Sequence, residues 1–275
     1  MSASLSPAAL RAKERPSPLT TGHITVAGIE RVTPGVQRIT FAGEDLARLP
    51  DEEPGEIITL IWPEDGADRP ELPVNGWRFA PDAPDQHWRN YTVRDYVADG
   101  PDGPLLTVDF VLHGDHGRCS RWATGAQPGE VLGFAGPRIH FYGEPTADWT
   151  LLVGDETGLP SIAATLDRLP PGHPTLVFVE IADAGERQEM ASEADLVLEW
   201  VTRDGEPAGR SRRLEEAVRA ASFPRGTAKV WVAGESLAVR GLREHLRDER
   251  GLAIGPQQAI GYWKHRDTPD DVEEA

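Results

Sequence analysis

The spacing of apolar residues changes near the middle of the chain. Between residues 21 and about 145, glycine and proline turns separate short β-rich runs: HITVAGIERV, VQRITFAG, EIITLIW, RNYTVRDY, LLTVDFVLHG and EVLGFAGP. Many short strands with turn signals between them are typical of an antiparallel barrel. We therefore predict a β-barrel domain over residues 21–146.

From Asp148 onward the pattern is that of an α/β domain. Apolar runs alternate with helical segments in the order WTLLVGDE, SIAATLDRL, TLVFVEI, RLEEAVRAA, AKVWVAGE and LAVRGLREHLRDERG. This order predicts a parallel sheet, and runs that are apolar at nearly every position suit strands covered by helices on both faces. The predicted fold is thus an antiparallel β-barrel followed, at 147–266, by a parallel-sheet α/β domain.

Three segments fall outside this pattern. The first 20 residues lack the apolar centre of a secretory signal and read as a disordered leader, and residues 267–275 form an acidic tail. The stretch from Trp62 to Trp88, rich in proline, aspartate and tryptophan, reads as a long excursion at the surface or over the site.

Composition narrows the functional class. No run approaches the ~20 apolar residues of a membrane helix. A single cysteine, Cys119, excludes an internal disulfide and a metal site built from several thiolates. We therefore expect a soluble, cytoplasmic protein without a metal centre. A formal net charge of −17 disfavours nucleic acid and anionic membranes as partners, and it makes any basic group in a cleft informative. We expect a monomer.

The first candidate site is the predicted strand that carries R-x-Y-T-x-R. Arg89 and Tyr91 alternate to one side, whereas Thr92 and Arg94 face the other. A tyrosine ring can stack on an isoalloxazine, a threonine hydroxyl can bond to the ring nitrogens, and an arginine fork can bind a phosphate. Taken alone, the motif also fits an ordinary strand with an exposed basic face.

The segment after the next strand favours a cofactor site over an ordinary strand. It reads H-G-x-x-G-x-x-S-x-W-A from His113 to Ala123, and its glycines and serine allow backbone N–H groups at a helix start to approach a diphosphate. The two motifs together resemble the siderophore-interacting protein branch of the ferredoxin–NADP reductase superfamily. The resemblance runs from about residue 22 to 266 and includes the motifs GP (136–137), VGDETGLP (153–160), VEIADA (179–184), VAGE (232–235) and GYWK (261–264).

The resemblance implies an FAD site in the barrel. The residues expected to bind the flavin ring and its ribityl-phosphate arm are Arg89, Tyr91, Thr92 and Arg94. Those expected to line the diphosphate are His113, Gly117, Cys119 and Ser120. Cys119 stands where the family usually has alanine and equally fits a small buried apolar residue. His113 equally fits a core histidine at a strand end.

It also implies a nicotinamide site, for NADPH or NADH, where α/β sheets bind ligands beyond their strand ends. The candidates in the two strand-end turns are Asp155, Thr157, Gly158, Gly234 and Glu235, of which Thr157 and Glu235 would position the nicotinamide. The alternative is that Asp155 or Thr157 caps one helix and Glu235 caps the next, over 236–247. Four arginines form a candidate site for the 2′-phosphate of NADPH, or else a solvated loop: Arg203, Arg210, Arg212 and Arg213.

The last candidates lie in GYWKHR, which follows the last predicted strand. In the family this tail reaches the flavin, so Trp263 is expected at the cofactor. Lys264 and Arg266, with Arg138, would attract an anionic ferric chelate. Alternatively Tyr262 and Trp263 only pack the domain interface. One departure concerns Thr59, which stands near a position where relatives commonly carry a lysine.

The function implied is that of an NAD(P)H-dependent ferric-siderophore reductase. Hydride would pass to FAD and single electrons to a bound ferric siderophore, with no acid–base residue required. A ferredoxin is a further candidate electron donor. Two alternatives stay open: a flavin reductase that serves another protein or a small organic substrate, and a chelate-binding protein that keeps the fold without catalysis.

Overall fold

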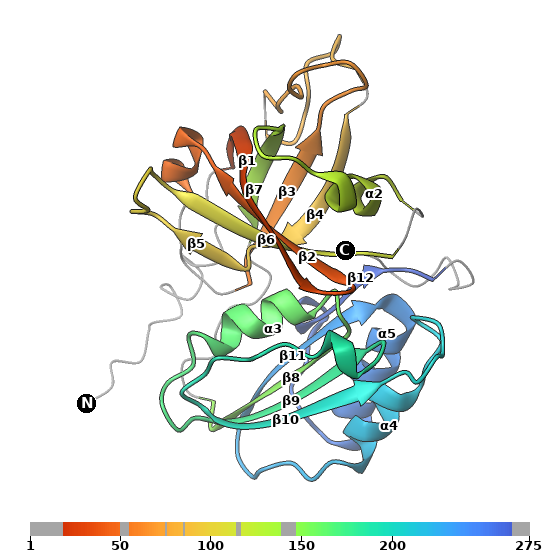
Figure 1. Cartoon of the computed structure of the whole chain (residues 1–275). Helices are drawn as coiled ribbons and strands as arrows, with labels where there is room; N and C mark the ends of the chain where they lie inside the picture. Colours follow the sequence, from red (N-terminus) through yellow and green to blue (C-terminus); the bar gives the residue numbers. More distant parts are fainter. Residues whose placement is uncertain are drawn as a thin grey trace.

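The computed structural model describes residues 19–49, 55–74, 76–84, 86–113, 117–138 and 147–265. Most of the expected leader and the whole acidic tail lie outside these ranges. The described residues form two sheets, with the antiparallel sheet stacked on the α/β domain (Figure 1). Among the described residues, no helix is long and apolar enough to cross a membrane.

The first sheet has the strand order β4-β3-β7-β1-β2-β6-β5. Its strands are β1 (Thr20–Thr33), β2 (Val36–Ala42), β3 (Ile57–Trp62), β4 (His87–Thr92), β5 (Asp95–Val97), β6 (Leu105–Val111) and β7 (Val131–Arg138). A 3-10 helix, η1 (Glu44–Arg48), follows β2, and α2 (Arg118–Gly125) lies between β6 and β7.

The sheet closes through the segment that carries the R-x-Y-T-x-R motif. β4 and β5 lie at opposite ends of the strand order, yet only two residues separate them along the chain. At this corner the backbone N–H of Val93 donates to Glu56 O (2.7 Å), and that of Arg94 donates to Thr107 O (2.9 Å). The chain thereby leaves the β3 edge and joins the β6 edge, which confirms the predicted barrel.

Alternation along the strands separates the barrel interior from its outer face. On β3, Ile58, Leu60 and Trp62 point into the core. They meet Leu132 and Phe134 of β7 there. The intervening residues of β3 therefore point to the other face of the sheet, where they are also buried.

The second sheet is parallel, with the order β10-β9-β8-β11-β12. Its strands are β8 (Trp149–Gly154), β9 (Pro174–Ile181), β10 (Asp195–Thr202), β11 (Ala228–Glu235) and β12 (Ala259–Trp263). The helices are α3 (Leu159–Leu166), α4 (Arg213–Ala220) and α5 (Ser236–Glu244), with short helices η2 (Ala184–Glu186), η3 (His245–Glu249) and η4 (Pro256–Gln258).

Both faces of the parallel sheet are covered, as the apolar runs predict. Leu151 and Val153 pack with residues of α4 and α5 in one core cluster. Leu152, between them, packs with residues of α3 in another. In Figure 1, α3 lies on the side of the sheet that faces the barrel.

Three local predictions need correction. β10 lies at the sheet edge and was not predicted, because its side chains alternate between exposed and half-buried rather than forming a continuous apolar run. The GYW of the tail belongs to β12 instead of following the last strand. The helix expected over 236–247 ends as α5 at Glu244, where a wider π-type turn begins. The excursion is irregular, but Trp62 and Trp88 at its ends belong to strands.

Polar contacts join the two domains. Arg94, at the barrel-closing corner, donates through Nη1 to the carboxylate of Asp167 just after α3 (2.7 Å). Thr33, at the end of β1, donates to the buried carboxylate of Glu186 (2.5 Å). The barrel is therefore held against the α/β domain on the side where α3 lies.

Candidate functional site

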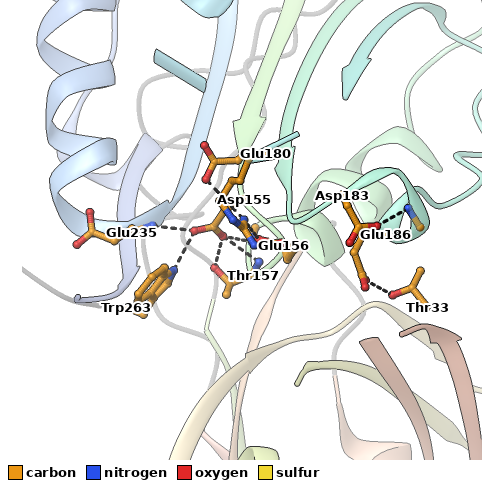
Figure 2. A network of polar contacts seen from close by, with 12 residues as sticks. Thr33, Asp155, Glu156, Thr157, Glu180, Asp183, Glu186, Glu235 and Trp263 are labelled. Atoms are coloured by element: carbon orange, nitrogen blue, oxygen red, sulfur yellow. Dashed lines mark hydrogen bonds and ion pairs between the residues drawn. The ribbon is translucent and has the colours of Figure 1, made fainter. Parts of the chain in front are cut away.

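Asp155 ties together the carboxyl ends of three parallel strands (Figure 2). Its Oδ1 accepts hydrogen bonds from the backbone N (2.8 Å) and Oγ1 (2.6 Å) of Thr157 and from Gly158 N (3.3 Å). Its Oδ2 accepts from Glu235 N (3.0 Å) and from Trp263 Nε1 (2.9 Å). One carboxylate thus fixes the turns after β8 and β11 and the last residue of β12.

All five partners of this carboxylate are donors, as suits the ionised form. Burial raises the pKa of Asp155, while the hydrogen bonds from Thr157 and Trp263 act in the opposite direction. With the side chain buried, its observed role is to position the loops. The expected contact of Asp155 with the nicotinamide stays a prediction.

Two glycines allow these turns to approach each other closely. A Cβ at Gly158 would lie 2.7 Å from Ala233 O, and a Cβ at Gly234 would lie 2.8 Å from Asp155 Oδ2. Gly234 also has a φ of 155°, which side chains other than glycine rarely adopt. Larger residues would push the two strand ends apart.

Glu235 takes the capping role that the sequence left open. Its Oε2 accepts from the backbone N of Leu237 (2.7 Å) and of Ala238 (3.0 Å) at the start of α5. Its Oε1 accepts from His265 N (3.2 Å) and so holds the chain beyond β12. Contact of Glu235 with the nicotinamide stays a prediction.

The four arginines predicted to bind the 2′-phosphate have different surroundings in the structure. Arg203 is buried and grips Glu156 with two hydrogen bonds (2.6 and 2.8 Å), which leaves it unsuited to bind phosphate. Arg213 pairs with Asp204 (3.0 Å). Arg210, Arg212 and Arg213 are all exposed.

At the barrel, Tyr91 lies over the core with its ring 4.5 Å from that of Phe110. Burial raises the pKa of Tyr91 and also that of the Cys119 thiol. His87 Nε2 lies 3.3 Å from Cys119 Sγ. Cys119 is therefore a neutral, half-buried thiol beside the tyrosine, in agreement with its interpretation as a small apolar residue.

The residues expected at the diphosphate gather around the start of α2. Gly117 has a φ of 110°, and a Cβ there would meet His113 Cε1 at 3.0 Å. His113 N donates to Ser120 Oγ (3.1 Å). Arg89 is exposed, and its charge adds to the effect of burial in lowering the pKa of His87. Within the described part of the chain, Arg89 bonds only to Trp88 O, so it is available for an anion, and this end of the site fits the phosphates of FAD.

Arg94 lies at the other end of the motif. Its side chain pairs with Asp167 across the domain boundary, as described above, rather than reaching towards α2. Its role in FAD binding stays a prediction, and the structure adds an interdomain ion pair.

Thr92 and Tyr262 meet where the barrel approaches β12. Thr92 is buried, and burial raises the pKa of Tyr262. The hydroxyls of Ser161 and Thr92 lie close enough to lower that pKa, but the buried Tyr262 hydroxyl completes no hydrogen bond within the described residues. A buried hydroxyl left without a partner beside Thr92 suits the polar edge of a flavin ring.

The candidate substrate residues come from both domains. Arg138 ends β7 on the barrel, whereas Lys264 follows β12; Arg266 lies outside the described residues. Thr59 donates to Asn90 Oδ1 (2.8 Å), so a neutral pair occupies that part of the strand surface.

Sequence reasoning missed Trp77, which comes from the excursion. The guanidinium carbon of Arg138 lies 5.2 Å from its ring centroid. The tryptophan content of the excursion was the available signal. Only the fold shows that the excursion returns to β7.

Comparisons with known proteins agree with this arrangement. Residues 25–141 match the family model described as siderophore-interacting FAD-binding domain, and residues 147–266 match that described as siderophore-interacting protein. A siderophore utilization protein from T. fusca is 35% identical in its crystal structure, with a TM-score of 0.80 over 93% of this chain and 97% of that one. The ferric vibriobactin reductase ViuB of Vibrio cholerae is 31% identical over 85% of each chain. The NADPH-dependent ferric-chelate reductase of Escherichia coli is 27% identical over 88% of this chain and 92% of its own.

Proposed function

The chain belongs to the siderophore-interacting protein family, and from this premise we propose that it is an FAD-dependent NAD(P)H oxidoreductase that reduces ferric siderophores. Two relatives are named as ferric reductases, which supports reduction of ferric iron as the class of reaction. The match of the barrel to an FAD-binding domain supports the cofactor.

One observation carries the proposal beyond the family. Thr92, Ile57 and Arg138 lie directly opposite one another across β4, β3 and β7. Two strand spacings of about 4.8 Å separate the outer members of this row, so a flavin contact and a cation lie roughly 10 Å apart. An anionic chelate bound at Arg138 would thus lie within electron-transfer range of a ring held at Thr92.

The reaction balances without a protein acid or base. One NAD(P)H delivers two electrons, two ferric chelates become ferrous, and NAD⁺ or NADP⁺ leaves with one proton. Bound FAD supplies the link, because a flavin accepts a hydride and passes electrons on singly. Hard oxygen donors hold Fe(II) less firmly than Fe(III), so reduction frees the metal.

The residues of the chain then have separable tasks. Arg89 and the start of α2 bind the phosphates, while Tyr91 and Thr92 hold the ring. The Asp155 network holds the strand-end turns in place, and these turns would align a bound nicotinamide with the flavin. Lys264 and Arg266 stay candidates for chelate binding, and a ferredoxin stays a candidate donor.

The test is an anaerobic visible spectrum of the FAD-loaded protein. NADPH or NADH should bleach the flavin bands, and a ferric siderophore should restore them. A protein that takes up FAD but is bleached by neither nicotinamide would contradict the assignment.

Replacement of Arg138 by glutamine separates the two half-reactions. Arg138→Gln should leave bleaching by NADPH unchanged and slow recovery with an anionic ferric chelate roughly tenfold, because the attracting charge is lost. Neutral ferric tris(acetohydroxamate) is the control and should recover at the wild-type rate. Equal slowing with both chelates would contradict a role for the positive charge of Arg138 in binding the chelate.

A further inference from the structure

Arg138 and Trp77 form a stacked pair on the outer face of the barrel. The guanidinium carbon lies 5.2 Å from the ring centroid, within cation–π range. Trp77 is 47% exposed. The pair therefore presents an aromatic surface and a cation at the same place.

Arg138 is unusual for a protein with 45 acidic residues. Its Nε is buried without a hydrogen-bond partner, and among the described residues no carboxylate pairs with it. Burial lowers its pKa, as expected for a cation that lacks a compensating anion. By contrast, Arg38 and Arg203 are each matched to a carboxylate. A cation left unpaired in an acidic protein suits an anion that arrives from solution.

The strand register shows what surrounds this cation. Thr59 and Asn90 lie opposite each other in the row of paired residues next to that of Arg138, and the Thr59 hydroxyl donates a hydrogen bond to the Asn90 side chain. Trp88, opposite Ile61 in the row beyond, is 47% exposed. Among the described residues of β3, β4 and β7 that alternate to the same side as Arg138, it is the only cation, and Arg89 of β4 is an exposed cation on the opposite side.

The excursion is built to hold Trp77 there. Pro70 and Leu72 cover Gly133, where a Cβ would come within 3.1 Å of the proline and 2.7 Å of the leucine. The backbone N–H of Val74 donates to Arg78 O (2.9 Å), which closes the turn that carries Trp77. The packing of the excursion against β7 therefore positions Trp77 beside Arg138.

We propose that Trp77 is a specificity-determining residue that selects ferric chelates with aryl donor groups. The indole face stacks on a phenolate or catecholate ring of the chelate, and Arg138 binds one of its anionic oxygens. The inference rests on the proposed function, because it assigns the ligand of the same site.

Redox-inert gallium(III) complexes separate binding from reduction. Gallium complexes of bis(ortho-hydroxybenzyl)ethylenediamine diacetate and of ethylenediaminetetraacetate carry the same single negative charge, but only the first has aryl donors. Their affinities for the FAD-loaded protein are measured by calorimetry. Wild type should bind the aryl complex more tightly.

Three variants decide the role of the ring. Trp77→Ala should weaken binding of the aryl complex roughly five- to tenfold, the loss expected for one stacking contact, and change that of the aliphatic complex less than twofold. Trp77→Phe should retain most of the preference. Val74→Ala, on the same segment and 71% exposed, is the matched control and should change neither affinity.

Two results would overturn the inference: no aryl preference in wild type, or equal weakening of both complexes by Trp77→Ala, which would mean that Trp77 only supports Arg138. Bleaching by NADPH is recorded on the same samples. Bleaching by NADH is recorded as well, and a wild-type protein that neither nicotinamide bleaches would refute the reductase function while the gallium affinities still decide the binding preference.

Discussion

At the scale of single residues, Asp155 shows how a turn residue becomes a hub. The sequence indicates only that an aspartate after an apolar strand can cap the next helix. In the structure, Asp155 also accepts hydrogen bonds from the backbone N–H of Glu235 and the indole N–H of Trp263. These contacts follow from the order of β8, β11 and β12 in the sheet, which no local sequence pattern encodes. The candidate residues were thus identifiable from motifs, whereas their partners were not.

Asp155→Asn tests this hub. An amide nitrogen cannot accept a hydrogen bond, so one set of buried donors loses its partner at a cost of about 1–3 kcal/mol in the free energy of unfolding. Chemical denaturation measures the change. Asp183→Asn is the control, because Asp183 makes an exposed bond to Gly185 N (2.7 Å) and its loss should cost less. Similar values for the two variants would contradict a special role for Asp155.

At the scale of elements, the strands of the barrel were predictable because turns bounded each one and the core residues alternated. β10 was not, since an edge strand with exposed and half-buried residues carries a weak apolar signal. The tail was misplaced for a related reason: β12 is short, and its register with β11 shifts between Gly234 and Glu235. Its aromatic residues are strand residues that the parallel sheet holds.

Glu235→Gln tests whether this side chain acts chiefly as a helix cap. Loss of the charged cap of α5 should lower the free energy of unfolding by about 1 kcal/mol, since the carboxylate serves two backbone donors there. Bleaching of FAD by NADPH should continue at nearly the wild-type rate. Unchanged stability with slower bleaching would instead support contact with the nicotinamide.

At the scale of the whole molecule, polar contacts between described residues contribute to the orientation of the domains. Arg94 with Asp167 and Thr33 with Glu186 join the barrel to the α/β domain. The sequence predicted both domains but not these contacts, because residues 73 and 153 positions apart meet only once both folds have formed. Arg94 belongs to a cofactor motif and also makes an interdomain ion pair, so its two roles need to be distinguished.

Paired substitutions distinguish them. If the interdomain role dominates, Arg94→Ala and Asp167→Asn should both slow bleaching by NADPH, by a similar factor of roughly two to ten, while FAD is retained. Bound flavin is measured after gel filtration. Loss of FAD in Arg94→Ala alone would instead assign the arginine to the cofactor.

The corner that closes the barrel has a consequence for how such a protein can diverge. The same short segment supplies the residues expected at the flavin and joins the two edges of the sheet through Val93 and Arg94. Any ligand that favours this corner also favours the closed barrel. A related protein that had lost the cofactor would need other contacts to stabilise this corner of the barrel. The fold and the cofactor are therefore expected to be inherited together.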